Sequence, residues 1–243
     1  MNASLENRDE TAEWASRLGQ KLLFSVTVLP LLMWLFPSLV PFKFFEFWRV
    51  EGDVFIWFWS AWPMLVGALI VNLINEFIRD HGSMDEPRIR DVFLSGVRVS
   101  LCAGIFEEIL FRWLFFFQSI FAVKLGNFLF FGFIGFGFPE FFFTNVFGPI
   151  ADWVTFHQLG QYLFHETGWA VGAAMLAANA FFRDGHKYQG LLGYVNSWLI
   201  GMYLFWIMFQ YGLPIAILAH FAYDFMVFCV YAPIRIMISR RSS

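Results

Sequence analysis

Long apolar stretches without a single charged residue constrain this chain more than any other feature. Two of them, residues 22–42 and 54–75, reach the roughly 20 residues that a helix needs to cross a bilayer. The hydrophobic fraction of the chain is 59%, against roughly 45–50% in a soluble domain. A soluble fold of 243 residues could not bury that much apolar surface. The sequence therefore predicts an all-α, polytopic integral membrane protein.

The remaining apolar segments predict about eight transmembrane helices in total. Six more are expected: 92–123, 127–147, 149–167, 168–182, 190–211 and 213–238. Glycines and a proline interrupt 127–147, which leaves a straight helix, a broken helix and a re-entrant hairpin open there. The segment 149–167 is only moderately apolar and is either a poor span or an interfacial helix. With a cytoplasmic N-terminus, eight spans place eleven Lys and Arg residues inside and three outside, as the positive-inside rule requires. Seven spans would move five of the eleven outward. We expect an integral protein of a bacterial plasma membrane, with the lipid bilayer as its surroundings.

Charge and domain organisation narrow the partners further. The formal net charge is only −3, and the chain has no basic stripe, so nucleic acid is not an expected partner. Residues 1–91 are expected to form a polar N-terminal segment and two generic spans. Residues 92–243 are expected to form the core that carries the chemistry.

The stretch FEEILFRW, residues 106–113, places three charges inside an apolar segment. A charge at bilayer depth costs several kcal/mol, so it indicates function. Glu108 and Arg112 are four residues apart on one helix face and can form an ion pair. Glu107 points about 100° away and is left as an acid without a basic partner. An unpaired carboxylate in such a place is a candidate general base.

Two further polar motifs lie in later apolar helices. Phe-Arg-Asp-Gly-His closes a helix rich in small residues, and His-Phe-Ala-Tyr-Asp lies in the last span with its His and Asp on one face. Carboxylates and histidines together can activate water, with or without a metal ion. The candidate site is therefore Glu107, Glu108, Arg112, His186, His220 and Asp224.

These three motifs, in this order, resemble those of the CAAX protease and bacteriocin-processing family, also called the Abi or CPBP intramembrane proteases. FEEILFRW is similar to the family's Glu-Glu-x-x-x-Arg motif, FRDGH to Phe-x-x-x-His, and HFAYD to His-x-x-x-Asn/Asp. Each motif alone is a weak signal, whereas three in order on hydrophobic helices are a strong one. The resemblance covers about residues 95–230.

The resemblance implies a helical membrane fold with a polar intramembrane cavity and an endopeptidase activity. Glu107, with His186, would activate water to attack a peptide carbonyl. His220 and Asp224 would stabilise the oxyanion, and Glu108 and Arg112 would orient the site. The substrate would be a membrane-associated peptide or protein, such as a CAAX-like tail or a bacteriocin leader. If a divalent metal such as zinc takes part, its ligands would be Glu107, His186 and His220; the family pattern also supports a metal-free mechanism.

The sequence departs from the family pattern in three places. Trp113 stands where the family usually has Gly, and Asp224 stands where Asn is commoner. An ionised Asp cannot donate a hydrogen bond to an oxyanion, so Asp224 would have to be protonated, orient His220 or bind a metal. The spacing between Glu107 and His186, 79 residues, is longer than usual and indicates an insertion at about 125–165.

Two other functions remain open at the level of sequence. A bacteriocin-immunity or scaffolding protein could keep the fold without proteolysis, and a transporter could use the same polar cavity. A transporter is expected to show two related halves with broken helices, and none are evident. The insertion also contains a loose polar cluster, read as interfacial rather than as a metal site: Asp152, His157, His165 and Glu166.

Overall fold

The computed structural model describes residues 25–78, 89–165 and 168–242, and within these ranges every regular element is a helix. The polar N-terminal segment predicted before residue 22 lies outside the described residues. The all-α class is confirmed. The helices longer than one turn are Ser25–Leu35, α2 (Val54–Ile78), α3 (Ile89–Glu107), η1 (Glu108–Phe115), α4 (Phe116–Leu129), α5 (Phe138–Phe142), η3 (Phe143–Phe147), α6 (Gly148–Val154), α7 (Gly160–Leu163), α8 (Ala170–Gly185), α9 (Gly190–Tyr211) and α10 (Leu213–Ser242).

Two of these helices are long and apolar enough to cross a membrane, judged by length and composition. The qualifying segments are Val54–Val71 in α2 and Lys187–Tyr211, which covers α9. The segments Ser25–Leu35 and Leu213–Cys229 are also apolar but shorter. The bounds predicted for α9, residues 190–211, match the structure, and its end coincides with the left-handed Gly212.

Three of the expected spans are interrupted. The first, 22–42, is helical only as far as Leu35, because Pro37 and Pro41 disfavour helical backbone at the residues before them. The second of the later spans, 127–147, is broken between Leu129 and Phe138, where only the three-residue η2 (Gly132–Ile134) is helical. The third of the later spans, 149–167, stops being helical at Val154, and only the four-residue α7 follows. The described helices therefore do not reach a count of eight long spans.

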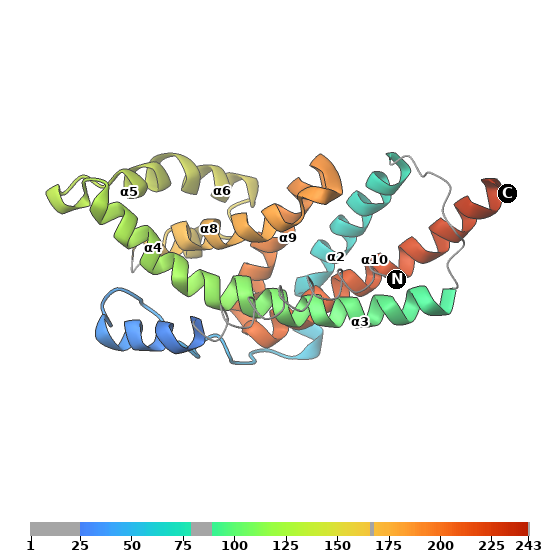
Figure 1. Ribbon diagram of the computed structural model, residues 1–243, viewed down its shortest axis with the longest axis horizontal. Coiled ribbons are helices and arrows are strands. Elements are labelled where there is room, and N and C mark those ends of the chain that lie inside the picture. The colour runs from blue at the N-terminus through green and yellow to red at the C-terminus, as the bar shows by residue number, and fades with distance from the viewer. Residues whose placement is uncertain (1–24, 79–88, 166–167, 243) are drawn as a thin grey trace, which may run out of the picture.

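One long helix forms the base of the molecule and bends in its middle. α3, η1 and α4 follow one another without a break, with 19, 8 and 14 residues. η1 is a π-helix, and such wider turns commonly cause kinks and often lie at functional sites. Figure 1 shows α3 and α4 running in different directions on either side of it. The charged residues of FEEILFRW lie at this bend.

Small residues let α3 approach α10 closely. A Cβ atom on Gly104 would lie 3.1 Å from both the carbonyl oxygen of Ile217 and the amide nitrogen of Phe221. Eight residues earlier, a Cβ atom on Gly96 would lie 3.0 Å from the side chain of Phe228, so the two helices are antiparallel. Ser100, between the two glycines, is fully buried. This stripe continues at the same four-residue spacing to Glu108 of η1 and so directs that carboxylate towards His220 on α10.

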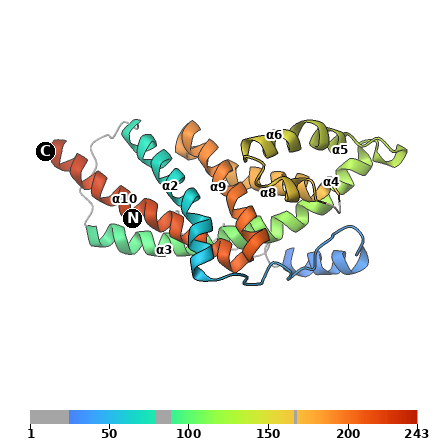
Figure 2. The same ribbon diagram turned by 180° about the vertical axis from the view of Figure 1, so that it is seen from behind.

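The other helices surround the bend. α9 lies between α2 and α8 in both views of the ribbon (Figures 1 and 2). The segment 36–53 is irregular but anchored on the turn between α9 and α10. The amide nitrogen of Leu213 donates to the carbonyl oxygen of Phe47 at 2.7 Å, and that of Glu51 donates to the carbonyl oxygen of Tyr211 at 3.0 Å. The end of the molecule that carries the α9–α10 turn is thus held by this segment.

Trp113 stands where the CPBP motif usually has Gly, and it connects the bent helix to the irregular segment 36–53. Its side chain is buried, its Nε1 donates to the carbonyl oxygen of Phe44 at 2.7 Å, and the two rings lie 4.6 Å apart. Phe45 and Trp48 pack against the other parts of the indole. A glycine could make none of these contacts, so the tryptophan is explained by the segment that precedes α2.

Replacing Trp113 with phenylalanine should lower the free energy of unfolding by about 1 kcal/mol, because the carbonyl oxygen of Phe44 loses its hydrogen-bond donor. Chemical unfolding in detergent micelles measures the change. The matched control is Trp59→Phe at a side chain that is half exposed, where a change below about 0.5 kcal/mol is expected. Equal effects of the two substitutions would contradict the anchoring role of Trp113.

Candidate functional site

Three of the predicted site residues meet in a buried cluster at the bend. Oε1 of Glu108 lies 3.2 Å from Nη1 of Arg112 and 2.7 Å from Nδ1 of His220. The side chains of Glu108 and Arg112 are fully buried, and that of His220 is 3% exposed. The ion pair expected between Glu108 and Arg112 is thus present. His220 faces the protein interior and joins α10 to η1 through Glu108.

Arg112 lies between aromatic rings from two other helices. Its guanidinium carbon is 3.9 Å from the ring centroid of Phe182 on α8 and 5.7 Å from that of Phe205 on α9. Both distances fall within the range of cation–π attraction. Arg112 therefore connects η1 to α8 and α9, and the carboxylate that pairs with it, Glu108, connects η1 to α10.

His220 is held by a carboxylate on each side of its ring. Because a carboxylate only accepts hydrogen bonds, Nδ1 of His220 donates to Glu108. Nε2 lies 3.6 Å from Oδ2 of Asp224, which is within ion-pair distance but too far for a hydrogen bond. Of the three roles open to Asp224, orientation of His220 is the one that this geometry favours.

Glu107 lies on the same bend, next to Glu108 in the chain. Its side chain is half-buried, and its Oε2 atom is buried without a hydrogen-bond partner among the described residues. Its charge acts on Arg112 and on Asp224. The sequence expectation of a spare acid beside an internal ion pair therefore agrees with the placement of Glu107.

His186 lies beside the cluster, on the other side of an aromatic ring. Its Nδ1 donates to the carbonyl oxygen of Phe182 at 2.8 Å, and its ring is 4.6 Å from that of Phe182 and 6.2 Å from that of Tyr188. The ring of His220 packs against the same Phe182 at 5.9 Å. No described contact joins His186 to Glu107, so their partnership stays a prediction.

The turn that carries His186 is fixed by a polar group centred on Asp184. The carboxylate of Asp184 accepts hydrogen bonds from Lys187 at 2.9 Å, Arg183 at 2.8 Å and Tyr194 at 2.9 Å. These donors, Lys187 above all, hold the pKa of Asp184 well below its ordinary value. The three donors therefore favour the ionised form of the carboxylate at this turn.

The candidate metal ligands are not arranged as a metal site. Among the described residues, no three His, Cys, Asp or Glu side chains gather as metal ligands would. The ring of Phe182 contacts both His186 and His220, and Nδ1 of His220 is already bonded to Glu108. The predicted set of Glu107, His186 and His220 therefore does not fit a metal ion in this arrangement. The groups that the site offers are acids and bases.

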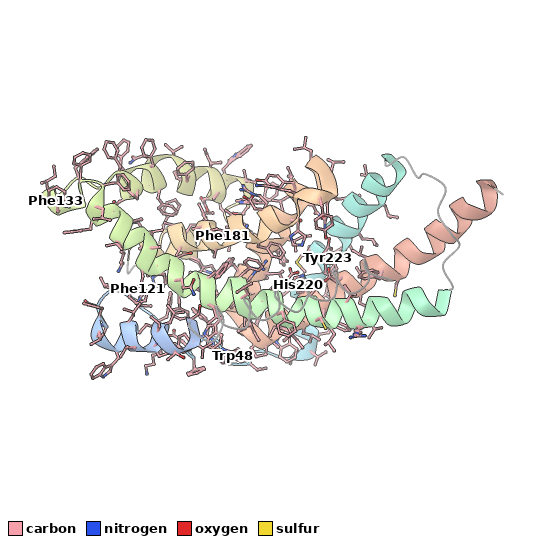
Figure 3. The ribbon with its side chains drawn as sticks, in the orientation of Figure 1. Trp48, Phe121, Phe133, Phe181, His220 and Tyr223 are labelled. Carbon is pink, nitrogen blue, oxygen red and sulfur yellow. The ribbon has the colours of Figure 1, made fainter. Side chains whose placement is uncertain are left out.

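Two wide apolar cavities flank the cluster. One, of about 580 Å³, lies between α2, α9 and the turn after α6, and is lined by Met64, Asn196 and Tyr203 among others. The other, of about 770 Å³, lies between α4, α8 and the α5–α6 segment, with Arg183 at its edge. None of the six predicted site residues lines either cavity. Figure 3 places His220 near the middle of the molecule and Phe133 at the tip of the α4–α5 hairpin.

Of the polar cluster expected in the insertion, the structure brings Asp152 and His157 together. Nδ1 of His157 lies 2.6 Å from Oδ2 of Asp152, and the His157 side chain is 71% exposed. The ring of His165 instead packs on Phe42, at 5.4 Å, and Glu166 lies outside the described residues. A turn role for Asp152 and His157 agrees with the reading of this segment as interfacial.

Two residues beside the cluster were not predicted from the sequence. Asn179 on α8 is fully buried, and its Nδ2 donates to the carbonyl oxygen of Trp198 on α9 at 2.9 Å. Gly201 on α9 lies against both Asn179 and Arg112. The one signal in the sequence was an amide in the stretch 168–182, which is otherwise made of small and apolar residues.

The comparisons with known proteins identify no relative: no family model, no curated protein and no solved structure matches this chain. The function is therefore argued from the site itself.

Proposed function

We propose that the protein is an intramembrane endopeptidase of the CAAX protease (CPBP) type, which hydrolyses a peptide bond of a membrane-associated substrate. The observation that carries the proposal has two parts. The buried Oε2 of Glu107 has no hydrogen-bond partner among the described residues, and Nδ1 and Nε2 of His220 each face a carboxylate. The charge of Glu107 acts on Asp224, one of these two carboxylates. A free base and an oriented imidazole at one bend are the groups needed to add water to a carbonyl group.

In the proposed reaction, Glu107 takes a proton from a water molecule as the water oxygen attacks the peptide carbonyl carbon. The negative charge that forms on the carbonyl oxygen is stabilised at Nε2 of His220, in its protonated form, while Nδ1 stays bonded to Glu108. Glu107 then returns the proton to the leaving amine, which completes the hydrolysis. Asp224 orients His220, and Arg112 balances the charge of Glu108.

We also propose that the chain is a polytopic membrane protein, with the eight-span, cytoplasmic N-terminus arrangement as the version that its Lys and Arg distribution favours. The described surface supports this proposal, since many large apolar side chains are exposed on α2, on the α4–α6 hairpin and on α9. Lipid is the solvent in which such a surface is stable.

A second candidate, a non-proteolytic scaffolding or immunity protein of the same fold, is favoured by one specific observation. Glu108, Arg112 and His220 are almost completely buried, and they pair with one another. A polar cluster that only joins helices would have this closed form. The two candidates differ in what they require of Glu107, whose buried Oε2 has no hydrogen-bond partner among the described residues.

The test is peptide hydrolysis by the purified full-length chain in liposomes. The probes are a prenylated CAAX peptide, a bacteriocin leader peptide and a synthetic transmembrane segment, with products identified by mass spectrometry. The protease proposal predicts a new product from at least one probe with the wild type and none with Glu107→Gln. Products that form equally with both proteins would exclude Glu107 as the base, and an absence of products from all three would favour the scaffold.

A further inference from the structure

The guanidinium of Arg112 makes fewer hydrogen bonds than a buried charge normally does. Its Nε, Nη1 and Nη2 atoms are all buried, and none has a hydrogen-bond partner with adequate geometry among the described residues. The contact of Nη1 with Glu108 at 3.2 Å is an ion pair only. Because buried donors are nearly always satisfied, an acceptor for this group is to be expected close by.

An unused acceptor lies on the neighbouring helix. Oδ1 of Asn179 is buried and also has no hydrogen-bond partner among the described residues. Its orientation is fixed by the other end of the amide, because Nδ2 donates to the carbonyl oxygen of Trp198 and a carbonyl oxygen cannot donate in return. The amide oxygen is therefore presented, as an acceptor, towards the place where α8, α9 and η1 meet.

Gly201 opens the space between these two groups. A Cβ atom on residue 201 would overlap Oδ1 of Asn179 and would lie 3.0 Å from Nη2 of Arg112. Both atoms thus border the same small gap, which exists only because residue 201 has no side chain. The unused acceptor and the unused donor face each other there, within reach of a direct hydrogen bond after a small rotation or of one bridging water.

We infer that Asn179 is a positioning residue of the site: its amide oxygen holds the Nη2 side of Arg112 across the gap at Gly201. Arg112 in turn fixes the carboxylate of Glu108, which holds His220 through Nδ1. This role rests on the proposed protease function. It extends the working site to two residues on α8 and α9 that lie outside the three motifs.

Four variants separate positioning from mere helix packing. Asn179→Ala removes the acceptor, and kcat should fall roughly tenfold with KM unchanged, the effect of losing about one hydrogen bond to a charged group. Asn179→Asp keeps an acceptor towards Arg112 but loses the donor to Trp198, and it should retain most of kcat. Gly201→Ala should lower both stability and kcat. Adding Asn179→Ala to Gly201→Ala removes the overlap, so stability should recover while kcat stays low.

A second readout does not depend on activity. In protein labelled with ¹⁵N-histidine, the hydrogen-bonded Nδ1–H signal of His220, assigned by its loss in His220→Gln, should persist in Asn179→Asp and shift or broaden in Asn179→Ala. If Asn179→Ala leaves both this signal and kcat unchanged, Asn179 has no positioning role, even where Glu107→Gln abolishes cleavage. If instead the wild type cleaves none of the three probes, the protease proposal fails, and the His220 signal still decides the role of Asn179.

Discussion

Replacing Glu107 with glutamine is expected to lower kcat for peptide hydrolysis by about 10²–10⁴-fold, the usual contribution of a general base. Glutamine has nearly the shape of glutamate but cannot accept a proton from water. The fold should survive, because Oε2 of Glu107 makes no hydrogen bond with the described residues and the substitution removes a charge from a partly buried place. Initial rates and thermal unfolding, measured on the same preparation in liposomes, give both quantities.

The matched control for this prediction is Glu140→Gln at the exposed start of α5. Oε2 of Glu140 accepts a hydrogen bond from Asn127 at 3.2 Å, and a glutamine oxygen can accept the same bond. The rate of peptide hydrolysis and the thermal stability of Glu140→Gln should equal those of the wild type. A Glu107→Gln protein that hydrolyses substrate at the full rate would exclude Glu107 as the general base, and the base would then have to be another residue.

The second large effect is expected at Arg112. Replacement by methionine leaves the fully buried carboxylate of Glu108 without its positive partner, and breaking such a pair from one side costs about 3–5 kcal/mol of the free energy of unfolding. The double substitution of Glu108→Gln with Arg112→Met removes both charges. It should lower the free energy of unfolding clearly less than Arg112→Met alone does. Denaturant titration in micelles, followed by tryptophan fluorescence, measures these differences.

The control for burial is Arg183→Met. Arg183 also pairs with a neighbouring carboxylate, that of Asp184, but its side chain is 27% exposed and that of Asp184 40%. Exposed pairs contribute about 0–1 kcal/mol, so a small loss is expected. Two results would contradict a stabilising role for the buried Glu108–Arg112 pair. One is a loss of unfolding free energy in Arg112→Met that is no larger than the loss in Arg183→Met. The other is a double variant that is less stable than Arg112→Met alone.

Much of the site could be predicted from spacing alone. The four-residue separation of Glu108 and Arg112, and of His220 and Asp224, places each pair on one helix face whatever the rest of the fold does. The resulting contacts, at 3.2 Å and 3.6 Å, are local consequences of helix geometry. The bounds of α9 could also be predicted from the sequence, because the apolar stretch ends at a glycine.

The contacts between helices could not be predicted in this way. Which of the two adjacent glutamates meets His220 depends on how α3 crosses α10, and that crossing is set by Gly96 and Gly104 rather than by the charged motif. The role of Trp113 depends on an irregular segment whose mixture of aromatic and charged residues does not fix its path. Asn179 becomes informative only once Gly201 is known to lie opposite it, a pairing that has no sequence signature.

The breaks in the expected spans have another origin. Hydropathy reports whether a residue prefers lipid, and it does not report whether the backbone stays helical. Residues 36–53 are rich in aromatic groups yet leave the helix after Leu35, where two prolines follow. After Val154 the backbone turns through two residues with positive φ, Phe156 at 53° and His157 at 61°, which ends the helix within an apolar stretch.

The most direct test of the proposed activity is a map of new peptide N-termini in membranes that contain either the wild-type chain or Glu107→Gln. Chemical labelling of free amines, followed by mass spectrometry, identifies each cleavage site even when the substrate has not been identified. The proposal predicts a defined set of membrane-associated sites with the wild type that is absent with Glu107→Gln at equal expression. Identical sets of termini in the two membranes would contradict it.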